Sequence, residues 1–464
     1  MAKAPIDKNK LFGETPIPKA LYAMAVPTII SQLINLIYNM VDAFFLGRTG
    51  NAYMMAATSV TLTLVLMNIA LSNLFGTGGG SLVARPMGAG RPDRARQVSA
   101  CSVYGAILAA VCFSALVGIF NTPLLRFLGA SDTTLGFART YSLVVTCVGS
   151  LPAILSMTLG HLLRNAGYSG KASFGLSGGG ILNVALDPLF MFVLLPPGNE
   201  VLGAAVATAL SNTAACVYLL IAYRRAGRES SLCLSPKEAA AIGKEDLRGI
   251  FAVGVPSAVL LALFDLANIC VNILSSGHSD LVLAGMGIVM KVERIPNAMN
   301  VGLCQGMIPI IAYNYSAGNR ERLEETVRVA RKAGLIICLC SMAFFEIVAR
   351  PAVSVFLRAE GEDALRTVAY AALFLRIRCL ASPMQFLNYH TSYGLQAMGK
   401  GRATLLHAAV RELVFYIPCM FLLDRLFGEV GLAAALPAGE GLGAVFALWL
   451  MRRTLNKQKD HSLS

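Results

Sequence analysis

The sequence contains little charge for its length. Only 14% of its 464 residues are Asp, Glu, Lys or Arg, whereas 56% are hydrophobic, and a soluble domain carries nearer a quarter charged residues. Residues 49–84, 97–125 and 201–223 contain no charged residue at all. Runs of this length and composition are typical of transmembrane helices. The composition excludes an ordinary soluble domain and predicts an all-α integral membrane protein.

Motifs of enzymes and metal-binding proteins are also missing. The cysteines form no CxxC pair, and the five histidines are isolated, so no zinc spacing is present. The glycines at 76–80 lie inside an apolar run, and Gly170-Lys171 lacks the rest of a P-loop. We therefore expect no cofactor, no nucleotide site and no enzymatic activity. The amino-terminal segment has no signal-peptide core, so we expect the first helix to be retained.

Apolar segments predict about twelve transmembrane helices in two six-helix lobes. The expected spans are 20–46, 54–84, 97–121, 138–162, 171–195, 202–224, 249–274, 281–313, 329–349, 366–392, 403–424 and 430–451. The corresponding domains are a cytoplasmic tail (1–19), an amino-terminal lobe (20–224), a cytoplasmic linker (225–248), a carboxy-terminal lobe (249–452) and a second cytoplasmic tail (453–464).

The basic residues follow this arrangement. With twelve spans, most of the 39 Lys and Arg residues fall on the side of the membrane that holds both termini. The residues assigned to the opposite side, in its loops or at the ends of the spans, are Arg48, Arg126, Arg139, Arg350, Arg358, Arg366 and Arg425. Because basic loops stay in the cytoplasm, we expect both termini there. The net charge of +13 thus reflects topology, and we expect no nucleic-acid partner.

The two halves of the sequence repeat each other. Ala25-Val26-Pro27 and Gly254-Val255-Pro256 open the first and seventh spans, and glycine-containing loops around Gly90 and Gly318 follow the second and eighth. The segments 163–167 and 395–399 correspond in the same way. Since each copy holds an even number of spans, both enter the membrane from the same side, which defines a parallel repeat.

The first span carries a polar stripe. Its polar side chains recur at steps of three and four residues, which places them on one helix face: Thr28, Gln32, Asn35, Asn39 and Asp42, with Tyr38 one turn before Asp42. A carboxylate in hydrocarbon costs at least about 2.5 kcal/mol, so the stripe is expected to face protein or a wet cavity. The alternative is that Asp42 lies at the outer helix end and is merely hydrated.

A second candidate group lies in the fifth span. Asn183 and Asp187 are one turn apart on one helix face, and Pro188 leaves the carbonyl of Val184 without its usual donor. Oxygen ligands of this kind suit a proton or a sodium ion. The alternative is a proline kink with a capping carboxylate. Both Asp42 and Asp187 fall in the outer half of their helices, so we expect them to face one cavity.

The carboxy-terminal half contains further polar groups. Asp265, Asn268 and Asn272 share a helix face in the seventh span and are candidates for the substrate cavity, as are Gln32, Asn35 and Asn39. Charged residues also fall inside later spans: Lys291, Glu293, Arg294, Arg376, Arg378, Arg411 and Glu412. Neutralising pairs between helices are the alternative to a functional role. We expect Glu293 to pair with a cation such as Arg376 or Arg411.

Together these segments resemble the multidrug and toxic compound extrusion (MATE) family. The resemblance rests on the polar first span, the segment 183–188, the loop 88–93 and the sequence GLCQGMIPIIAYNY at 302–315, which is similar to the bacterial multidrug branch. It implies twelve helices in two lobes and cation antiport by alternating access. It also implies a cation-coupling site at Tyr38, Asp42, Asn183, Asp187 and Thr208, with Asp42, Asp187 and Asn183 as metal ligands if sodium is the coupling ion.

The sequence departs from the family at Arg376 and Arg378, which stand where some members have a carboxylate, and Asp265 is the nearest match to an acid in the seventh helix. The leading interpretation is a monomeric antiporter of the cell membrane that exports amphipathic, cationic small molecules in exchange for protons or sodium. One alternative is a flippase for lipid-linked saccharides of the same superfamily. Another is a membrane-embedded lipid-modifying enzyme, for which no headgroup-level carboxylate or histidine cluster is visible.

Overall fold

The computed structural model describes residues 8–228, 230–356 and 361–463, and these residues are helical with short connections. Arg358 and the first seven residues of the predicted tail lie outside them. The chain forms two compact units. One comprises the described residues up to Ala258 together with Ala312–Arg320, and the other comprises Val259–Ile311 and the described residues from Glu321 onward.

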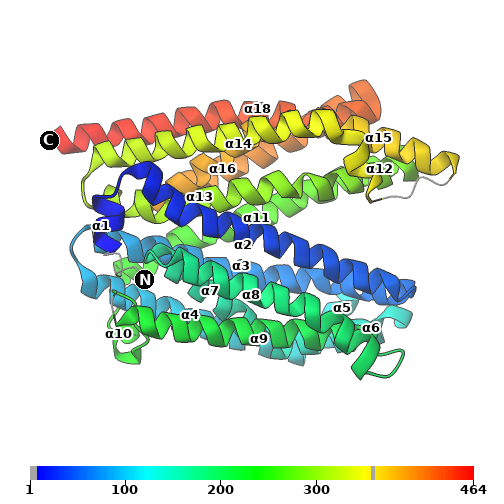
Figure 1. The fold of residues 1–464 in the computed structure, drawn as a ribbon, viewed down its shortest axis with the longest axis horizontal. Helices are drawn as coiled ribbons and strands as arrows, with labels where there is room; N and C mark the ends of the chain where they lie inside the picture. Colours follow the sequence, from blue (N-terminus) through cyan, green and yellow to red (C-terminus); the bar gives the residue numbers. More distant parts are fainter. Residues whose placement is uncertain (1–7, 229, 357–360, 464) are drawn as a thin grey trace, which may run out of the picture. The chain divides into compact units, whose positions relative to one another are not determined.

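The first unit is a bundle of long helices, drawn from blue to green in Figure 1. Here α2 packs against α8, α3 against α4 and α7, and α8 against α9. Its elements are α1 (Lys8–Gly13), α2 (Ile17–Arg48), α3 (Ala52–Gly88), α4 (Pro92–Ile119), α5 (Asn121–Phe127), α6 (Asp132–Ser142), η1 (Leu143–Val148), α7 (Ser150–Asn165), α8 (Ser169–Pro188), η2 (Leu189–Leu194), α9 (Glu200–Gly227) and α10 (Pro236–Ala240).

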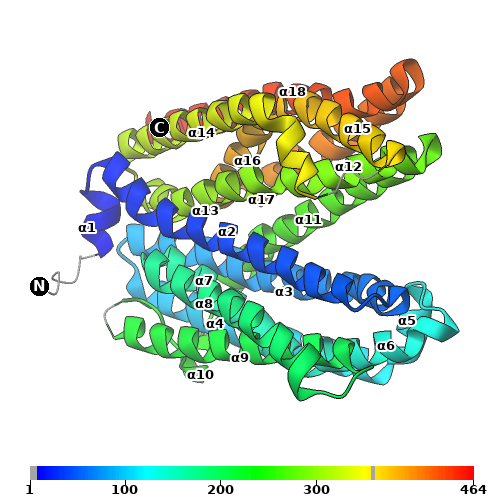
Figure 2. The same ribbon diagram turned by 45° about the vertical axis from the view of Figure 1, so that its right-hand side comes forward.

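The second unit is also a helical bundle, and its yellow α15 lies beside α12 in both ribbon views (Figures 1 and 2). Two helices, α11 and α13, contribute to both units. The elements from α11 onward are α11 (Lys244–His278), α12 (Asp280–Val292), α13 (Arg294–Ser316), α14 (Arg320–Ser354), α15 (Glu362–Cys379), α16 (Ser382–Ala397), α17 (Gly401–Ala409), η3 (Val410–Tyr416) and α18 (Ile417–Leu463). The labels η1 to η3 denote π-helical segments.

Eight continuous helices among the described residues are long and apolar enough to cross a membrane, and a ninth span results if α6 and η1 are joined to α7 across a 48° bend. The remaining spans are interrupted. The span expected at 281–313 is divided at Glu293, and the one at 366–392 is divided between α15 and α16. One of the eight, the segment from Gly401, covers two expected spans, with non-helical backbone at Gly428. The twelve-span organisation predicted from the sequence therefore holds.

The internal repeat is visible in the way the helices end. Gly90 and Gly318 both have positive φ, and the residue after each donates to the carbonyl five positions earlier, at Pro86 and Asn314. Gly167 and Gly399 form the second matching pair, with bonds of the same type. This is the Schellman ending, in which a left-handed residue lets the chain satisfy the last carbonyls of the helix. The repeated loops thus have the same backbone structure.

Helix α8 approaches its neighbours closely because one of its faces is rich in glycine. A Cβ atom at Gly175 would lie 2.6 Å from Leu219 and 2.7 Å from Tyr218 of α9, whereas one at Gly178 would meet nothing within 4 Å. Small residues at such positions let membrane helices pack backbone to backbone. The position of α8, and of the polar residues near its end, therefore depends on Gly175.

We predict that Gly175→Ala lowers the unfolding temperature of the purified protein and that Gly178→Ala does not. Overpacking a tight contact costs about 1 to 3 kcal/mol, while an open helical glycine gains up to about 1 kcal/mol on replacement by alanine. Thermal unfolding in detergent measures both variants. Equal effects of the two substitutions would mean that α8 and α9 are not held at this distance.

Candidate cation-binding site

Two helices of the first unit bring four of the predicted site residues together. Helix α2 carries Tyr38 and Asp42, and α8 carries Asn183 and Asp187 near its end. The α8 helix gives way to the π-helical segment η2 directly after Pro188, as expected where proline removes a backbone donor. Asp187 has no exposed surface and Asn183 is 3% exposed, so both lie inside the helix bundle.

The hydrogen bonds of this site are incomplete. Asn183 Nδ2 donates to Asp187 Oδ1 at 3.1 Å and lies 3.5 Å from Thr208 Oγ1 of α9. The other oxygen of Asp187, Oδ2, and Oδ1 of Asp42 are buried without a hydrogen-bond partner in the described part of the chain. The two carboxylates also interact electrostatically with each other. A buried polar atom without a partner costs about 1 to 3 kcal/mol, and more when it is charged.

Two tyrosines complete the surroundings. The Tyr38 ring packs on α8, where a Cβ atom at Gly180 would come within 2.7 Å of it. Tyr38 interacts electrostatically with Asp42. Tyr141 of α6 is 7% exposed and interacts electrostatically with Asp42, Asp187 and Tyr38. The sequence analysis did not identify Tyr141, because neither its spacing nor its neighbours set it apart from other apolar-helix tyrosines.

This arrangement fits a bound proton or sodium ion. Its available ligands are carboxylate, amide and hydroxyl oxygens, the type that hard cations prefer, and two carboxylate oxygens have no other partner. No Lys, Arg or His contributes to the electrostatics of either carboxylate among the described residues. A cation would therefore supply the missing positive charge, and Asp42, Asp187 and Asn183 would hold it.

The other residues of the polar stripe on α2 differ in burial and in their hydrogen-bond partners. Thr28 is fully buried and hydrogen-bonds Ser169 of α8 at 3.0 Å. Gln32 and Asn35 are half-buried, and Asn39 is exposed and donates to the Asn35 carbonyl at 2.6 Å. The amino-terminal part of the stripe is thus a helix–helix contact, while the part nearer the end of α2 carries Tyr38 and Asp42.

The residues of α11 predicted to line the substrate cavity belong to the second unit. Asp265 and Asn268 are half-buried and Asn272 is exposed. Asp265 interacts electrostatically with Arg294 of α13, so a basic residue lies near it. These three residues do not assemble into a set of oxygen ligands comparable to the group around Asp187.

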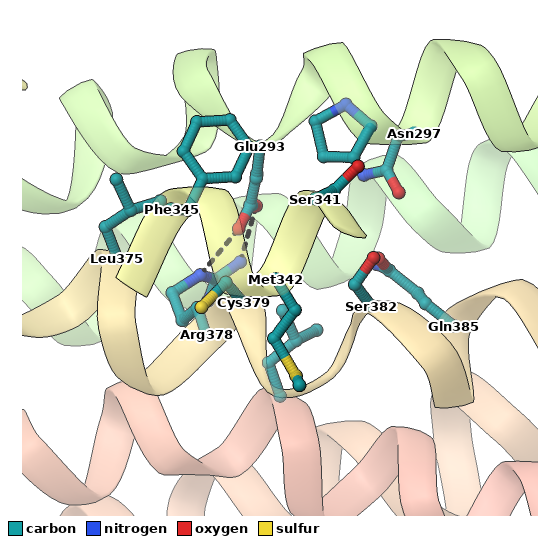
Figure 3. Close-up of a pocket in the computed structure, with 12 residues that line it drawn as sticks. Glu293, Asn297, Ser341, Met342, Phe345, Leu375, Arg378, Cys379, Ser382 and Gln385 are labelled. Carbon is teal, nitrogen blue, oxygen red and sulfur yellow. Dashed lines mark hydrogen bonds and ion pairs between the residues drawn. The ribbon is translucent and has the colours of Figure 1, made fainter. Parts of the chain in front are cut away.

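Glu293 is neutralised, as expected, but by a different arginine. Arg378 of α15 donates to it through Nε at 2.9 Å and Nη2 at 2.7 Å, and Figure 3 shows the two side chains pointing at each other. The partners proposed from the sequence are wrong: Arg376 is exposed and Arg411 pairs with Glu440. Because Arg378 lies two positions after Arg376, about 200° around the helix, only one of them faces the bundle.

This pair lines a small pocket within the second unit. Polar side chains from three further elements share it, as Figure 3 shows for Asn297, Ser341 and Gln385. Since Glu293 and Arg378 cancel each other's charge, the cavity carries no net charge from this pair. The arginines that depart from the family pattern therefore do not create a positive site here.

A long, strongly apolar helical chain with buried carboxylates in its interior defines a membrane transporter rather than an enzyme. The chain belongs to the MatE family: a sequence model of this family matches residues 27–189 and again residues 256–422. The double match confirms the internal repeat and the resemblance to MATE transporters.

Curated relatives extend over the whole chain. "Multidrug export protein MepA" of Staphylococcus saprophyticus is 28% identical over 455 residues, covering 97% of this chain and 98% of its own length. The protein of the same name from Staphylococcus aureus strain MRSA252 is 28% identical over 441 residues, with 95% and 94% covered.

Solved structures share the fold. One, described as the outward-facing conformation of a multidrug resistance MATE family transporter, has a TM-score of 0.91 at 22% identity and covers 99% of this chain and 100% of its own. Another, MATE in the bent conformation, has a TM-score of 0.89 at 21% identity with complete coverage of both chains. The twelve-helix MATE fold is thereby confirmed.

We predict that a cation stabilises the folded protein through Asp187. A ligand present at 100 times its dissociation constant contributes about 2.7 kcal/mol to folding, so sodium chloride, or acidification if the ligand is a proton, should raise the unfolding temperature by several degrees. Choline chloride controls for ionic strength. Asp187→Asn should lose the increase, and Asp132→Asn should keep it, because Asp132 is a surface residue paired with Arg126. An equal increase in both variants would exclude Asp187 as a ligand.

Proposed function

We propose that this protein is a secondary antiporter that exports amphipathic, cationic organic compounds in exchange for protons or sodium by alternating access. The observation that carries the proposal is the pair of carboxylates with orphaned oxygens, Asp42 and Asp187. The curated relatives named as multidrug export proteins support the substrate class. We further propose that the protein acts as a monomer in the cell membrane, with both termini in the cytoplasm.

The coupling follows from charge. Two carboxylates in one poorly hydrated site resist being charged together, so the empty site favours a conformation in which water or a cationic substrate reaches them. A proton or sodium ion arriving from outside neutralises the pair. The site can then close, and the substrate is released to the outside. The ion shifts this equilibrium only through its different affinities for the two conformations.

Helix α2 is built to bend during this cycle. Pro27 interrupts its hydrogen bonding. Ser169 Oγ of α8 donates to the Met24 carbonyl at 2.7 Å, and Thr28 Oγ1 lies 3.0 Å from Ser169 Oγ. These bonds fix the helix to the start of α8 next to the proline. The segment beyond, which carries Tyr38 and Asp42, is the part that moves.

We predict that Asp42→Asn and Asp187→Asn abolish export while the protein still folds. Either substitution removes a charge permanently, so ion binding no longer changes the site. The assay is transport of a fluorescent lipophilic cation in proteoliposomes with an imposed proton or sodium gradient, which also identifies the coupling ion. Asp132→Asn serves as the matched surface control. If both variants still concentrate the dye at near the parental rate, the coupling residue lies elsewhere, and Asp265 is the next candidate.

Topology gives an independent prediction. Single cysteines replacing Ala240 and Ala317 should react with a membrane-impermeant thiol reagent only from the cytoplasm, and one replacing Asn199 only from outside. All three positions are exposed, and none needs a left-handed backbone. Labelling is compared with that of the parent, which retains native cysteines. Reaction of the Ala317 variant from outside would contradict the proposed orientation.

A further inference from the structure

The second unit contains three buried charges that do not balance. Arg411 and Glu412 lie on η3, and Glu440 lies on α18, with exposed fractions of 2%, 3% and 1%. Arg411 Nε donates to Glu440 Oε2 at 2.9 Å, and its Nη2 donates to Glu440 Oε1. The third nitrogen, Nη1, lies 3.5 Å from Glu412 Oε1. Two carboxylates therefore share one guanidinium, and the sharing is unequal.

Of the two glutamates, Glu440 has more hydrogen-bond donors to its carboxylate. Asn388 of α16 donates to its Oε2 at 2.6 Å and to its main-chain carbonyl at 3.1 Å. Together with the bidentate arginine, these bonds satisfy both carboxylate oxygens. A charged Glu440 is thus stabilised by three donors, which is the arrangement that makes a buried ion pair tolerable. Among the described residues, Glu412 has only the 3.5 Å contact to Arg411, which is already paired with Glu440.

Neighbouring titratable groups do not supply the missing positive charge. Those that face the group from η3 and the packed elements are Arg411, Tyr416, Tyr389 of α16, His407 of α17 and Glu440. His407 Nε2 lies 3.1 Å from Asn388 Oδ1, and since the Asn388 amide nitrogen donates to Glu440, Nε2 must be the donor. Ser392 Oγ lies 2.9 Å from His407 Nδ1, and because a hydroxyl can donate to Nδ1, a neutral imidazole satisfies both contacts.

The packing around this group is close and specific. A Cβ atom at Gly443 of α18 would lie 3.0 Å from the Asn388 amide and 3.3 Å from Arg411 Cγ, and one at Gly439 would lie 2.7 Å from the Tyr416 backbone. The π-helical turn directs two successive residues, Arg411 and Glu412, into the bundle, and such turns often occur at functional sites. A sodium ion at Glu412 would be repelled by the adjacent guanidinium, whereas a proton binds to the carboxylate itself.

We propose that Glu412 is a proton-binding site of the second unit, distinct from the Asp42–Asp187 site. With a proton on Glu412, the group is a neutral Arg411–Glu440 pair beside a neutral acid. Without it, the bundle holds one uncompensated negative charge, which is costly in an apolar interior. Proton binding and release at Glu412 therefore change the stability of the packing between η3, α16 and α18.

Infrared difference spectroscopy of the protein in lipid bilayers tests the proposal, because protonated and charged carboxyl groups absorb differently. The titration uses the Asp42→Asn/Asp187→Asn double variant and runs from neutral to alkaline pH, where exposed carboxylates stay charged. Should that background fail to fold, the parent chain serves instead. Adding Glu412→Gln should remove one titrating carboxyl signal, and adding Glu321→Gln on the exposed start of α14 should not. An unchanged spectrum with Glu412→Gln overturns the proposal.

Unfolding temperatures give a second readout. Glu412→Gln imitates the protonated acid, so at neutral pH it should shift the unfolding temperature by no more than a few degrees. Glu440→Gln breaks the principal ion pair and should lower it by on the order of 10 °C or prevent folding. The unfolding temperature of the parent should fall as pH rises, because Glu412 releases its proton. The fall should be smaller in Glu412→Gln, which has no proton to release at this position. Equal destabilisation by the two substitutions would make Glu412 a fixed structural carboxylate and would overturn the proposal.

Discussion

The cost of holding a carboxylate inside an apolar helix bundle governs the polar organisation of this protein. Each buried acid needs a compensating positive charge, hydrogen-bond donors or a bound cation. Glu293 and Glu440 have arginines in bidentate contact. Among the described residues, neither Asp42 nor Asp187 forms an ion pair with a basic residue, and one amide, that of Asn183, donates to Asp187. The acids with arginine partners secure the bundle, and those without partners are where a cation has the most effect.

Departures from regular helix geometry place these groups. Pro188 ends the α-helical hydrogen bonding next to Asp187, and π-helical turns follow it in η2 and carry Arg411 and Glu412 in η3. Glycines on the facing helices then allow close contact, at Gly180 beside Tyr38 and at Gly443 beside Asn388. An extra residue in a turn directs side chains inward that a regular helix would direct outward. Irregular backbone is therefore concentrated where polar groups are buried.

The sequence was most predictive where the pattern lies within a single helix. The spacing of Tyr38 and Asp42 and the Asn183–Pro188 segment predicted residues that the structure brings together, because helical periodicity fixes which side chains share a face. It could not identify Tyr141 or the pairing of Arg378 with Glu293, since contacts between helices depend on their relative rotation. Glu440 was missed for the same reason: it follows a small-residue stretch and has no local partner. The broken spans at Glu293 and Gly428 depend on tertiary packing as well.

The two units handle unbalanced charge in different ways, although they derive from one repeated sequence pattern. In the first, the excess lies on two carboxylates that share oxygen-rich surroundings, so a proton or a sodium ion can neutralise it. In the second, the excess lies beside a guanidinium, which disfavours a metal ion and favours a proton. We therefore propose that repetition of the fold does not repeat the ion chemistry. In this proposal, the cation that each unit binds depends on whether an arginine stands next to the carboxylate, which can differ between halves with the same helix order.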